Sequence, residues 1–314
     1  GIYGHFLRPL ADLMADRFML APSLGLCLMT CWSIARLTSF RGADLAAGEP
    51  RAFFQRIWQQ GKPFLLIVAV LTLVWSYRTL DRIPVWRDNL ALFGTDMPNL
   101  ERCARCHVFY AGALLDAYQK KGGNPSMAAE IEAHYRKAIM LTPKVYNARI
   151  ELAQFLYNQQ RYAEGIAVAQ ECQRQFPEAA RAYYFLGYGQ YFKGDYAEAS
   201  QNLQKSCSMA PLRQDAPYYL AWSLYFGGQV AEAISQAGAA MLKFPENDQF
   251  PDALSDFQFG SGQVEAGFST LKAALARLHS PTLYKKIIQR YEESNLPEAA
   301  AAYRREAIQR GIQL

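Results

Sequence analysis

The spacing most specific for chemistry in this chain is the Cys-Ala-Arg-Cys-His run formed by Cys103, Cys106 and His107. A C-x-x-C-H run is the pattern to which c-type haem is attached, and a compartment outside the cytoplasm would permit that attachment. The residues that follow continue a helical register, and no second cytochrome feature lies nearby. We therefore expect no haem and no other cofactor. The alternative is two cysteines on one helical turn, able to form a disulfide in an oxidising compartment, with His107 on the surface.

The remaining cysteines predict neither a metal site nor a reactive thiol. Cys27 and Cys31 lie in an apolar stretch, where thiols behave as small apolar side chains. Cys172 and Cys207 are expected to be buried in helices of successive repeats. With four histidines in the whole chain, no zinc ligand set is predicted.

No catalytic arrangement is apparent in the sequence. It contains no Gly-rich phosphate loop, no G-x-S-x-G run and no His/Glu cluster with metal-ligand spacing. Asp12 and Asp16 share a helical face next to Arg17, which favours a solvated amphipathic turn over a pair of catalytic carboxylates. The net charge of +5 is small, and no dense Lys/Arg run with interleaved aromatics occurs, so we expect no nucleic-acid partner.

Two apolar segments predict a membrane region in residues 1–98. Residues 18–35 are eighteen residues without a charge, which is the length at which a helix can cross a bilayer. A second uncharged run begins at Pro63 and reaches spanning length near Leu80 if Arg78 snorkels. The alternative is a buried core hairpin, which is disfavoured because residues 65–75 are apolar on all sides. We expect an integral membrane protein with spans at about 18–35 and 63–80.

The basic residues predict the orientation of these spans. The segment between them contains Arg36, Arg41, Arg51, Arg56 and Lys62 against Asp44 and Glu49, whereas Arg78, Arg82 and Arg87 follow the second span. By the positive-inside rule the connecting loop is cytoplasmic. The large C-terminal region is then expected outside the cytoplasm, in a periplasm or an ER lumen. Because the chain begins at Gly1, we also expect it to be part of a longer protein.

The strongest pattern in the sequence is a period of 34 residues. Several columns repeat in the same phase: Pro143, Pro177, Pro211, Pro245; Glu130, Glu164, Glu198, Glu232; Leu152, Leu186, Leu220, Leu254; and the small residues Ala153, Gly187, Ala221, Ser255. The leucine and the small residue allow one helix to pack closely on the next, and the proline ends the second helix. This period is that of the tetratricopeptide repeat (TPR), a helical hairpin.

The period predicts an all-α chain, with two transmembrane helices followed by a TPR superhelical solenoid. A single hairpin does not bury its own apolar face, so stacked neighbours must form the core. We expect about five repeats in residues 99–280, the first interrupted by a polar turn at 120–126 and the fifth weaker. Residues 281–314 are expected to form capping helices.

The first helix of each repeat predicts an inner wall suited to binding. Residues spaced to face away from the second helix are Asn147, Ile150, Gln154, Tyr157, Arg181, Tyr184, Tyr188, Tyr191, Asp215, Tyr218, Trp222 and Tyr225. Aromatic rings with a few polar tips suit an extended peptide or a sugar. The alternative for Tyr157, Tyr191 and Tyr225, one per repeat, is that they pack between adjacent hairpins. The predicted partner is therefore a polypeptide.

Two short segments resemble a known family. The run from Met14 to Cys27 (MADRFMLAPSLGLC) is similar to the A-E-R-Y-L-Y-L-P-S-x-G-F-C signature of TPR-bearing transmembrane O-mannosyltransferases. The run from Arg82 to Phe93, followed by Pro98 and Asn99, resembles the W-x-(D/N)-x-x-x-L-F segment that joins the last span to the repeats in that family. The resemblance implies an enzyme that transfers mannose from a polyprenyl-phosphate lipid to Ser or Thr of acceptor proteins. Its catalytic residues lie in an N-terminal loop that this sequence does not include.

These observations leave two functions open. In the first, the chain is the C-terminal membrane and TPR portion of a protein O-glycosyltransferase, with its groove presenting the acceptor protein. In the second, it is a non-catalytic, membrane-anchored TPR adaptor that assembles a protein complex. No residue of this chain is predicted to be catalytic in either case.

Overall fold

The computed structural model describes residues 62–120, 122–211 and 213–313, and the regular elements in those ranges are all helices. The chain divides into two compact units, Gly1–Leu92 and Phe93–Leu314. In the first unit the described residues form α3 (Lys62–Arg82) and the short 3-10 helix η2 (Ile83–Arg87). The predicted span at 18–35, the loop after it and the motif at 14–27 lie outside the described residues.

The helix α3 covers the second predicted span, 63–80. Leu66, Leu73 and Leu80 expose 67%, 70% and 66% of their surface. Nevertheless, none of the helices in the described ranges has the length and apolar character needed to cross a bilayer. In α3 the apolar stretch is bounded by Lys62 at one end and by Arg78 and Asp81 at the other. The predicted helix is therefore present, but its prediction as a membrane span is not supported.

Residues of the second motif, which follow α3, begin the next helix, α4 (Asn89–Asp96). The Asp88 carboxylate accepts a hydrogen bond from the Ala91 backbone N–H at 2.8 Å, and the Arg87 side chain donates to the same carboxylate at 3.2 Å. The bond from Ala91 is the main cause that lowers the pKa of Asp88. The acidic position of the W-x-(D/N) motif is thus explained by helix capping.

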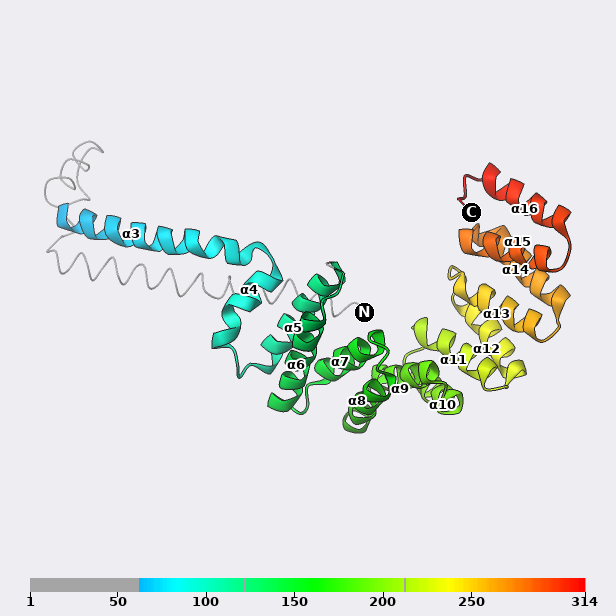
Figure 1. The fold of residues 1–314 in the computed structure, drawn as a ribbon, viewed down its shortest axis with the longest axis horizontal. Coiled ribbons are helices and arrows are strands. Elements are labelled where there is room, and N and C mark those ends of the chain that lie inside the picture. Colours follow the sequence, from blue (N-terminus) through cyan, green and yellow to red (C-terminus); the bar gives the residue numbers. More distant parts are fainter. Residues whose placement is uncertain (1–61, 121, 212, 314) are drawn as a thin grey trace, which may run out of the picture. The chain divides into compact units, whose positions relative to one another are not determined.

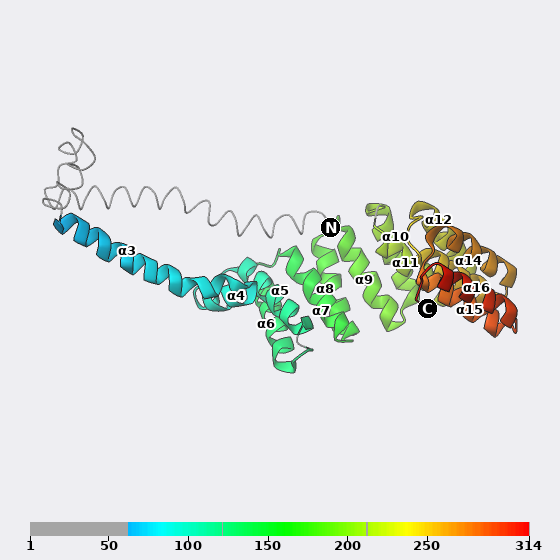
Figure 2. The same cartoon turned by 90° about the horizontal axis from the view of Figure 1, so that it is seen from above.

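The second unit is a row of helical hairpins (Figures 1 and 2). After the 3-10 helix η3 (Met97–Asn99), six hairpins follow within the described ranges: α5 (Ala104–Lys120) with α6 (Pro125–Leu141), α7 (Tyr146–Asn158) with α8 (Tyr162–Gln175), α9 (Ala180–Lys193) with α10 (Tyr196–Met209), α11 (Asp215–Phe226) with α12 (Val230–Lys243), α13 (Gln249–Gly260) with α14 (Val264–Leu278), and α15 (Pro281–Glu293) with α16 (Pro297–Gln309). We call the surface formed by the first helices, α7, α9, α11, α13 and α15, the inner face.

The repeat columns act as the sequence predicts. Each second helix from α6 to α12 ends two residues before its proline, at Leu141, Gln175, Met209 and Lys243. The turn inside each of four hairpins contains a residue with positive φ, at Gln160, Gly194, Gly228 and Gly262, again 34 residues apart. Glycine adopts this left-handed backbone at little cost, which explains its use at three of these positions.

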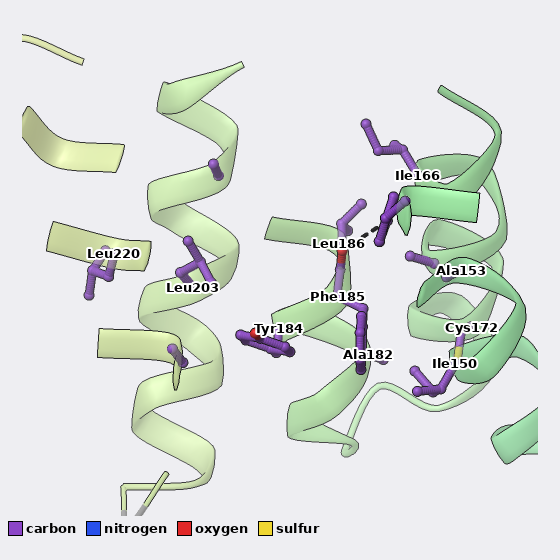
Figure 3. Packing of buried hydrophobic residues seen from close by; sticks show 14 residues of the cluster. Ile150, Ala153, Ile166, Cys172, Ala182, Tyr184, Phe185, Leu186, Leu203 and Leu220 are labelled. Atoms are coloured by element: carbon purple, nitrogen blue, oxygen red, sulfur yellow. Dashed lines mark hydrogen bonds between the residues drawn. The ribbon is translucent and has the colours of Figure 1, made fainter. Parts of the chain in front are cut away.

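The leucine column and the small-residue column lie in the core. Leu152, Leu186, Leu220 and Leu254 are all buried. At Gly187 an added Cβ would lie 2.7 Å from Cγ of Leu203 and 3.0 Å from the backbone oxygen of Ala199, so α9 and α10 approach more closely than a side chain would allow. Figure 3 shows Ala182, Phe185 and Leu186 of α9 on the side of α7 and α8, and Tyr184 on the side of Leu203 and Leu220.

Candidate functional site

The Cys-Ala-Arg-Cys-His run closes a disulfide at the start of α5. Cys103 immediately precedes the helix, Cys106 lies in its first turn, and their sulfur atoms are bonded. The Cys106 backbone N–H also lies 3.2 Å from the Cys103 Sγ and donates to it. The structure thus agrees with the disulfide alternative, in which both thiols that haem attachment requires are used.

His107 is buried, with 5% of its surface exposed, which corrects its prediction as a surface residue. Its Nε2 lies 3.0 Å from the Glu101 backbone oxygen, and its Nδ1 lies 2.7 Å from Nδ1 of His134 on α6. A carbonyl only accepts, so Nε2 of His107 carries a proton and its Nδ1 accepts from His134 in the neutral pair. Burial, and secondarily His107, lowers the pKa of His134. The His107–His134 contact therefore ties α5 to α6, and the lowered pKa keeps His134 uncharged at neutral pH.

The ten residues predicted for peptide binding differ in accessibility. Asn147 and Gln154 are exposed, Arg181, Tyr188, Tyr191, Tyr218, Trp222 and Tyr225 are partly exposed, and Tyr157 and Tyr184 are buried. Tyr157 has 4% of its surface exposed, and its hydroxyl donates to the Phe185 backbone oxygen at 2.9 Å. Its ring lies against Gly165 and Gly189. Tyr157 therefore belongs to the core between hairpins, which agrees with the packing alternative for this residue and removes it from the inner wall.

Five aromatic residues form a continuous set on α9 and α11, which we call the aromatic strip: Tyr184, Tyr188, Tyr218, Tyr219 and Trp222. The ring centroids of Tyr188 and Tyr219 are 4.9 Å apart and those of Tyr218 and Tyr219 are 5.3 Å apart. Trp222 continues the set at 6.4 Å from Tyr218 and packs 4.8 Å from Phe257 of α13. Rings from two consecutive hairpins are thus joined, and four of the five belong to the predicted inner wall.

Tyr219 is the member that sequence reasoning missed, and it connects the two helices. Its ring is in contact with those of Tyr188, Tyr184 and Tyr191 on α9. The only sequence signal is the Tyr218-Tyr219 pair itself, because Tyr219 occupies the column that contains Phe185 in the previous repeat and Ala253 in the next. Because the residue type in this column changes from repeat to repeat, the 34-residue period could not identify Tyr219.

The strip is uncharged at neutral pH. Burial raises the pKa of Tyr184, Tyr188, Tyr218 and Tyr219 above the ordinary value for tyrosine, and it raises the pKa of the neighbouring Tyr191 to about 12. Every one of these hydroxyls therefore keeps its proton and remains able to donate. A surface of this kind offers ring area together with neutral donors and acceptors, which suits an uncharged polypeptide backbone.

A group of charges extends the inner face beyond the strip, and we call it the charged quartet: Asp252, Asp256, Lys286 and Arg290. The Lys286 Nζ lies 3.2 Å from Asp252 and 2.7 Å from Asp256, and Arg290 donates to Asp256 at 2.7 Å. Burial raises the pKa of Asp252, with Lys286 opposing the shift. Because opposite charges are paired, the quartet joins α13 to α15 and adds no net charge to the inner face.

The 34-residue period indicates this quartet, although the predicted inner wall ended at Tyr225, one repeat before it. Adding 34 to Tyr218 gives Asp252 and then Lys286, and adding 34 to Trp222 gives Asp256 and then Arg290. The same two columns thus change from aromatic to charged along the array. Within the described part of the chain, no group of three His, Cys, Asp or Glu side chains is arranged to hold a metal ion.

Comparison with known proteins identifies the fold but no family. No protein-family model matches the chain, and no curated protein matches it. Among solved structures, YrrB, titled a TPR protein with an unusual peptide-binding site, is 17% identical and covers 61% of this chain and 94% of its own, with a TM-score of 0.49. PilF of Pseudomonas aeruginosa is 13% identical, covering 66% and 90%, with a TM-score of 0.49.

The Cut9–Hcn1 hetero-tetramer of APC/C has a TM-score of 0.51 and 15% identity, covering 69% of this chain and 42% of the matched one. At that identity the likeness is one of fold. Together with the 34-residue period and the hairpins, it describes the second unit as a TPR-type helical array. None of the comparisons supports membership of the O-mannosyltransferase family.

Proposed function

We propose that this chain is an adaptor whose inner face binds an extended segment of a partner polypeptide. The observation that carries the proposal is the aromatic strip, in which Tyr188, Tyr218, Tyr219 and Trp222 remain partly exposed across two consecutive hairpins. Such rings offer contact area at low entropic cost, and their protonated hydroxyls reach a peptide backbone. The exposed amides of Asn147 and Gln154 on α7 extend the same surface.

The adaptor role is preferred to the transferase portion for a physical reason. The described part of the inner face offers a neutral aromatic surface for a polypeptide, and its charged quartet is joined in ion pairs between α13 and α15. The resemblance to mannosyltransferases depends on two short motifs. In the second of them, Asp88 is a helix cap. The polyprenyl-phosphate-linked sugar implied by the resemblance therefore has no supporting observation.

We expect the alanine variants of Tyr188 and Trp222 to bind peptide at least about 1 kcal/mol more weakly than the parent chain, because each ring is a large part of the exposed strip. The ligand is a peptide selected against the chain from a random library, and calorimetry measures its affinity. Leu242→Ala and Met140→Ala are matched controls, because these side chains expose 81% and 64% of their surface on second helices. Equal affinity in the strip variants and in the controls would contradict the proposal.

We propose further that α3 attaches the array to a membrane, with the array in an oxidising compartment. Exposed apolar side chains along α3, including Trp75 at 64% and Tyr77 at 72%, support contact with lipid. The Cys103–Cys106 disulfide supports the compartment, because disulfides persist in oxidising surroundings.

Flotation with phospholipid vesicles tests the attachment. The chain should float with the vesicles, and replacing Leu66, Leu73 and Leu80 together with aspartate should reduce the floating fraction severalfold, because charges on a lipid-facing surface are costly. Leu242→Asp, on the outer surface of α12, should have no effect. Unchanged flotation of the α3 variant would show that α3 does not make the attachment.

A further inference from the structure

The Cys103–Cys106 disulfide contributes little as a cross-link. A disulfide stabilises mainly by restricting the unfolded chain, and its effect grows with the length of the loop that it closes. These cysteines are three residues apart, so the bond constrains only the beginning of one helix. The helix α5 is already held to α6 by the His107–His134 contact and by the hydrogen bond from Tyr110 to Glu130 at 3.1 Å. The position of the disulfide therefore calls for a chemical explanation.

The surroundings of Cys103 favour a thiolate when the bond is broken. Its sulfur lies at the N-terminal end of α5 and accepts the Cys106 backbone N–H. Backbone donors and the positive end of the helix dipole stabilise a negative sulfur at such a position. Both cysteines are partly exposed, so a second thiol can reach them. By contrast, burial raises the pKa of the free thiols of Cys172 and Cys207 to about 11.

Contacts of the neighbouring histidine hold the segment that carries Cys103. The bond from His107 to the Glu101 backbone oxygen fixes the chain just before Cys103, and the bond to His134 fixes the helix just after Cys106. Further backbone bonds join Cys103 to Leu100 at 2.9 Å and His107 to Cys103 at 3.2 Å. None of these contacts involves the sulfur–sulfur bond. The two sulfur atoms should therefore keep their positions when the disulfide is reduced.

We infer that Cys103 and Cys106 form a redox-active pair that exchanges disulfides with the paired thiols of a polypeptide substrate. In the first step a substrate thiolate attacks Sγ of Cys103, the Cys103–Cys106 bond breaks, and Cys106 leaves with the electron pair and takes a proton. In the second step the other substrate thiolate attacks the substrate sulfur of the mixed disulfide, and Cys103 leaves as the thiolate. Two electrons pass from the substrate dithiol to the cysteine pair, and the substrate gains a disulfide.

The inference does not depend on peptide binding at the aromatic strip, and a redox titration of the full chain tests it. The chain is equilibrated in glutathione buffers of increasing ratio of reduced to oxidised form, the thiols are alkylated, and mass mapping reports each cysteine separately. We expect Cys103 and Cys106 to change together and reversibly from disulfide to dithiol, while the helical circular dichroism stays constant. A disulfide that remains in all of these buffers, or a loss of helix on reduction, would make the bond a structural cross-link and overturn the inference.

Single-cysteine variants test the order of the two steps. With Cys106→Ser, a model peptide whose single cysteine is disulfide-bonded to an aromatic thiol should form a stable mixed disulfide on Cys103 and release the aromatic thiol, because the peptide has no second thiol to expel Cys103. With Cys103→Ser the same peptide should react at Cys106 about tenfold more slowly, because Cys106 lacks the helix N–H donor to its sulfur. Circular dichroism confirms that both variants are folded. Equal rates for the two variants, or faster reaction at Cys106, would contradict the assignment of Cys103 as the attacked sulfur.

Discussion

Leu186→Ala should lower the free energy of unfolding by about 2 to 5 kcal/mol, the range for truncating a buried leucine. Leu186 has 4% of its surface exposed and belongs to the cluster formed by α7 to α11, which includes Ile166 and Leu203 (Figure 3). Its removal leaves a cavity in this cluster, and close-packed surroundings relax into such a cavity only in part. Denaturant unfolding followed by circular dichroism measures the loss.

A variant of the partly exposed aromatic strip should lose less stability than Leu186→Ala. Trp222→Ala should lower the free energy of unfolding by less than Leu186→Ala does, because part of the ring already contacts solvent. The two variants would then separate stability from binding, since Leu186→Ala should leave the peptide affinity of the folded fraction unchanged. Equal losses of stability would show that the aromatic strip is core rather than binding surface.

Gly189→Ala should lower the free energy of unfolding by about 1 to 3 kcal/mol, the usual cost of overpacking. The added Cβ would lie 2.4 Å from the hydroxyl oxygen of Tyr157 and 2.5 Å from its Cζ. The ring fills the space that both glycines leave, because a Cβ on Gly165 would also lie 2.3 Å from Cε1 of Tyr157, and the hydroxyl is held by its bond to the Phe185 backbone oxygen. Thermal and denaturant unfolding of the variant measure the effect.

A double-mutant cycle tests the cause of that loss. In a Tyr157→Leu background the far end of the ring is absent, so adding Gly189→Ala should cost little further stability. Gly238→Ala on α12 is the matched control, since its Cβ would meet nothing within 4 Å. This control should stabilise the helix by about 0.5 to 1 kcal/mol, the ordinary preference for alanine over glycine. A similar loss in both Tyr157 backgrounds would place the clash elsewhere.

Periodic features of this chain were predictable because the same helix–helix contacts recur in each repeat. The leucine and small-residue columns are buried, the prolines follow the ends of the second helices, and the turn glycines adopt positive φ at the same phase. These positions depend on local backbone geometry and on contacts between adjacent helices, which recur every 34 residues. Sequence columns therefore determine the hairpin fold.

Features that depend on one particular neighbour were not predictable. Tyr157 is buried because Gly165 and Gly189 leave space for its ring, whereas Tyr191 and Tyr225, one and two repeats later, are partly exposed. His107 is buried because His134, on the other helix of the hairpin, bonds to it. In both cases the deciding residue lies outside the pattern used for the prediction. The apolar run of α3 predicted a span, and a helix forms there, but none of the helices in the described ranges is long and apolar enough to cross a bilayer.

Site-specific photo-crosslinking tests most directly whether the aromatic strip binds an extended polypeptide. A benzophenone amino acid is placed at Tyr188, at Trp222 or at Leu242, and each chain is irradiated with the selected peptide. We predict crosslinks from positions 188 and 222 and none from position 242, which lies 81% exposed on α12. The two strip positions should also label different residues of the peptide, as an extended segment requires. Crosslinking at position 242 equal to that at 188 and 222 would contradict the account.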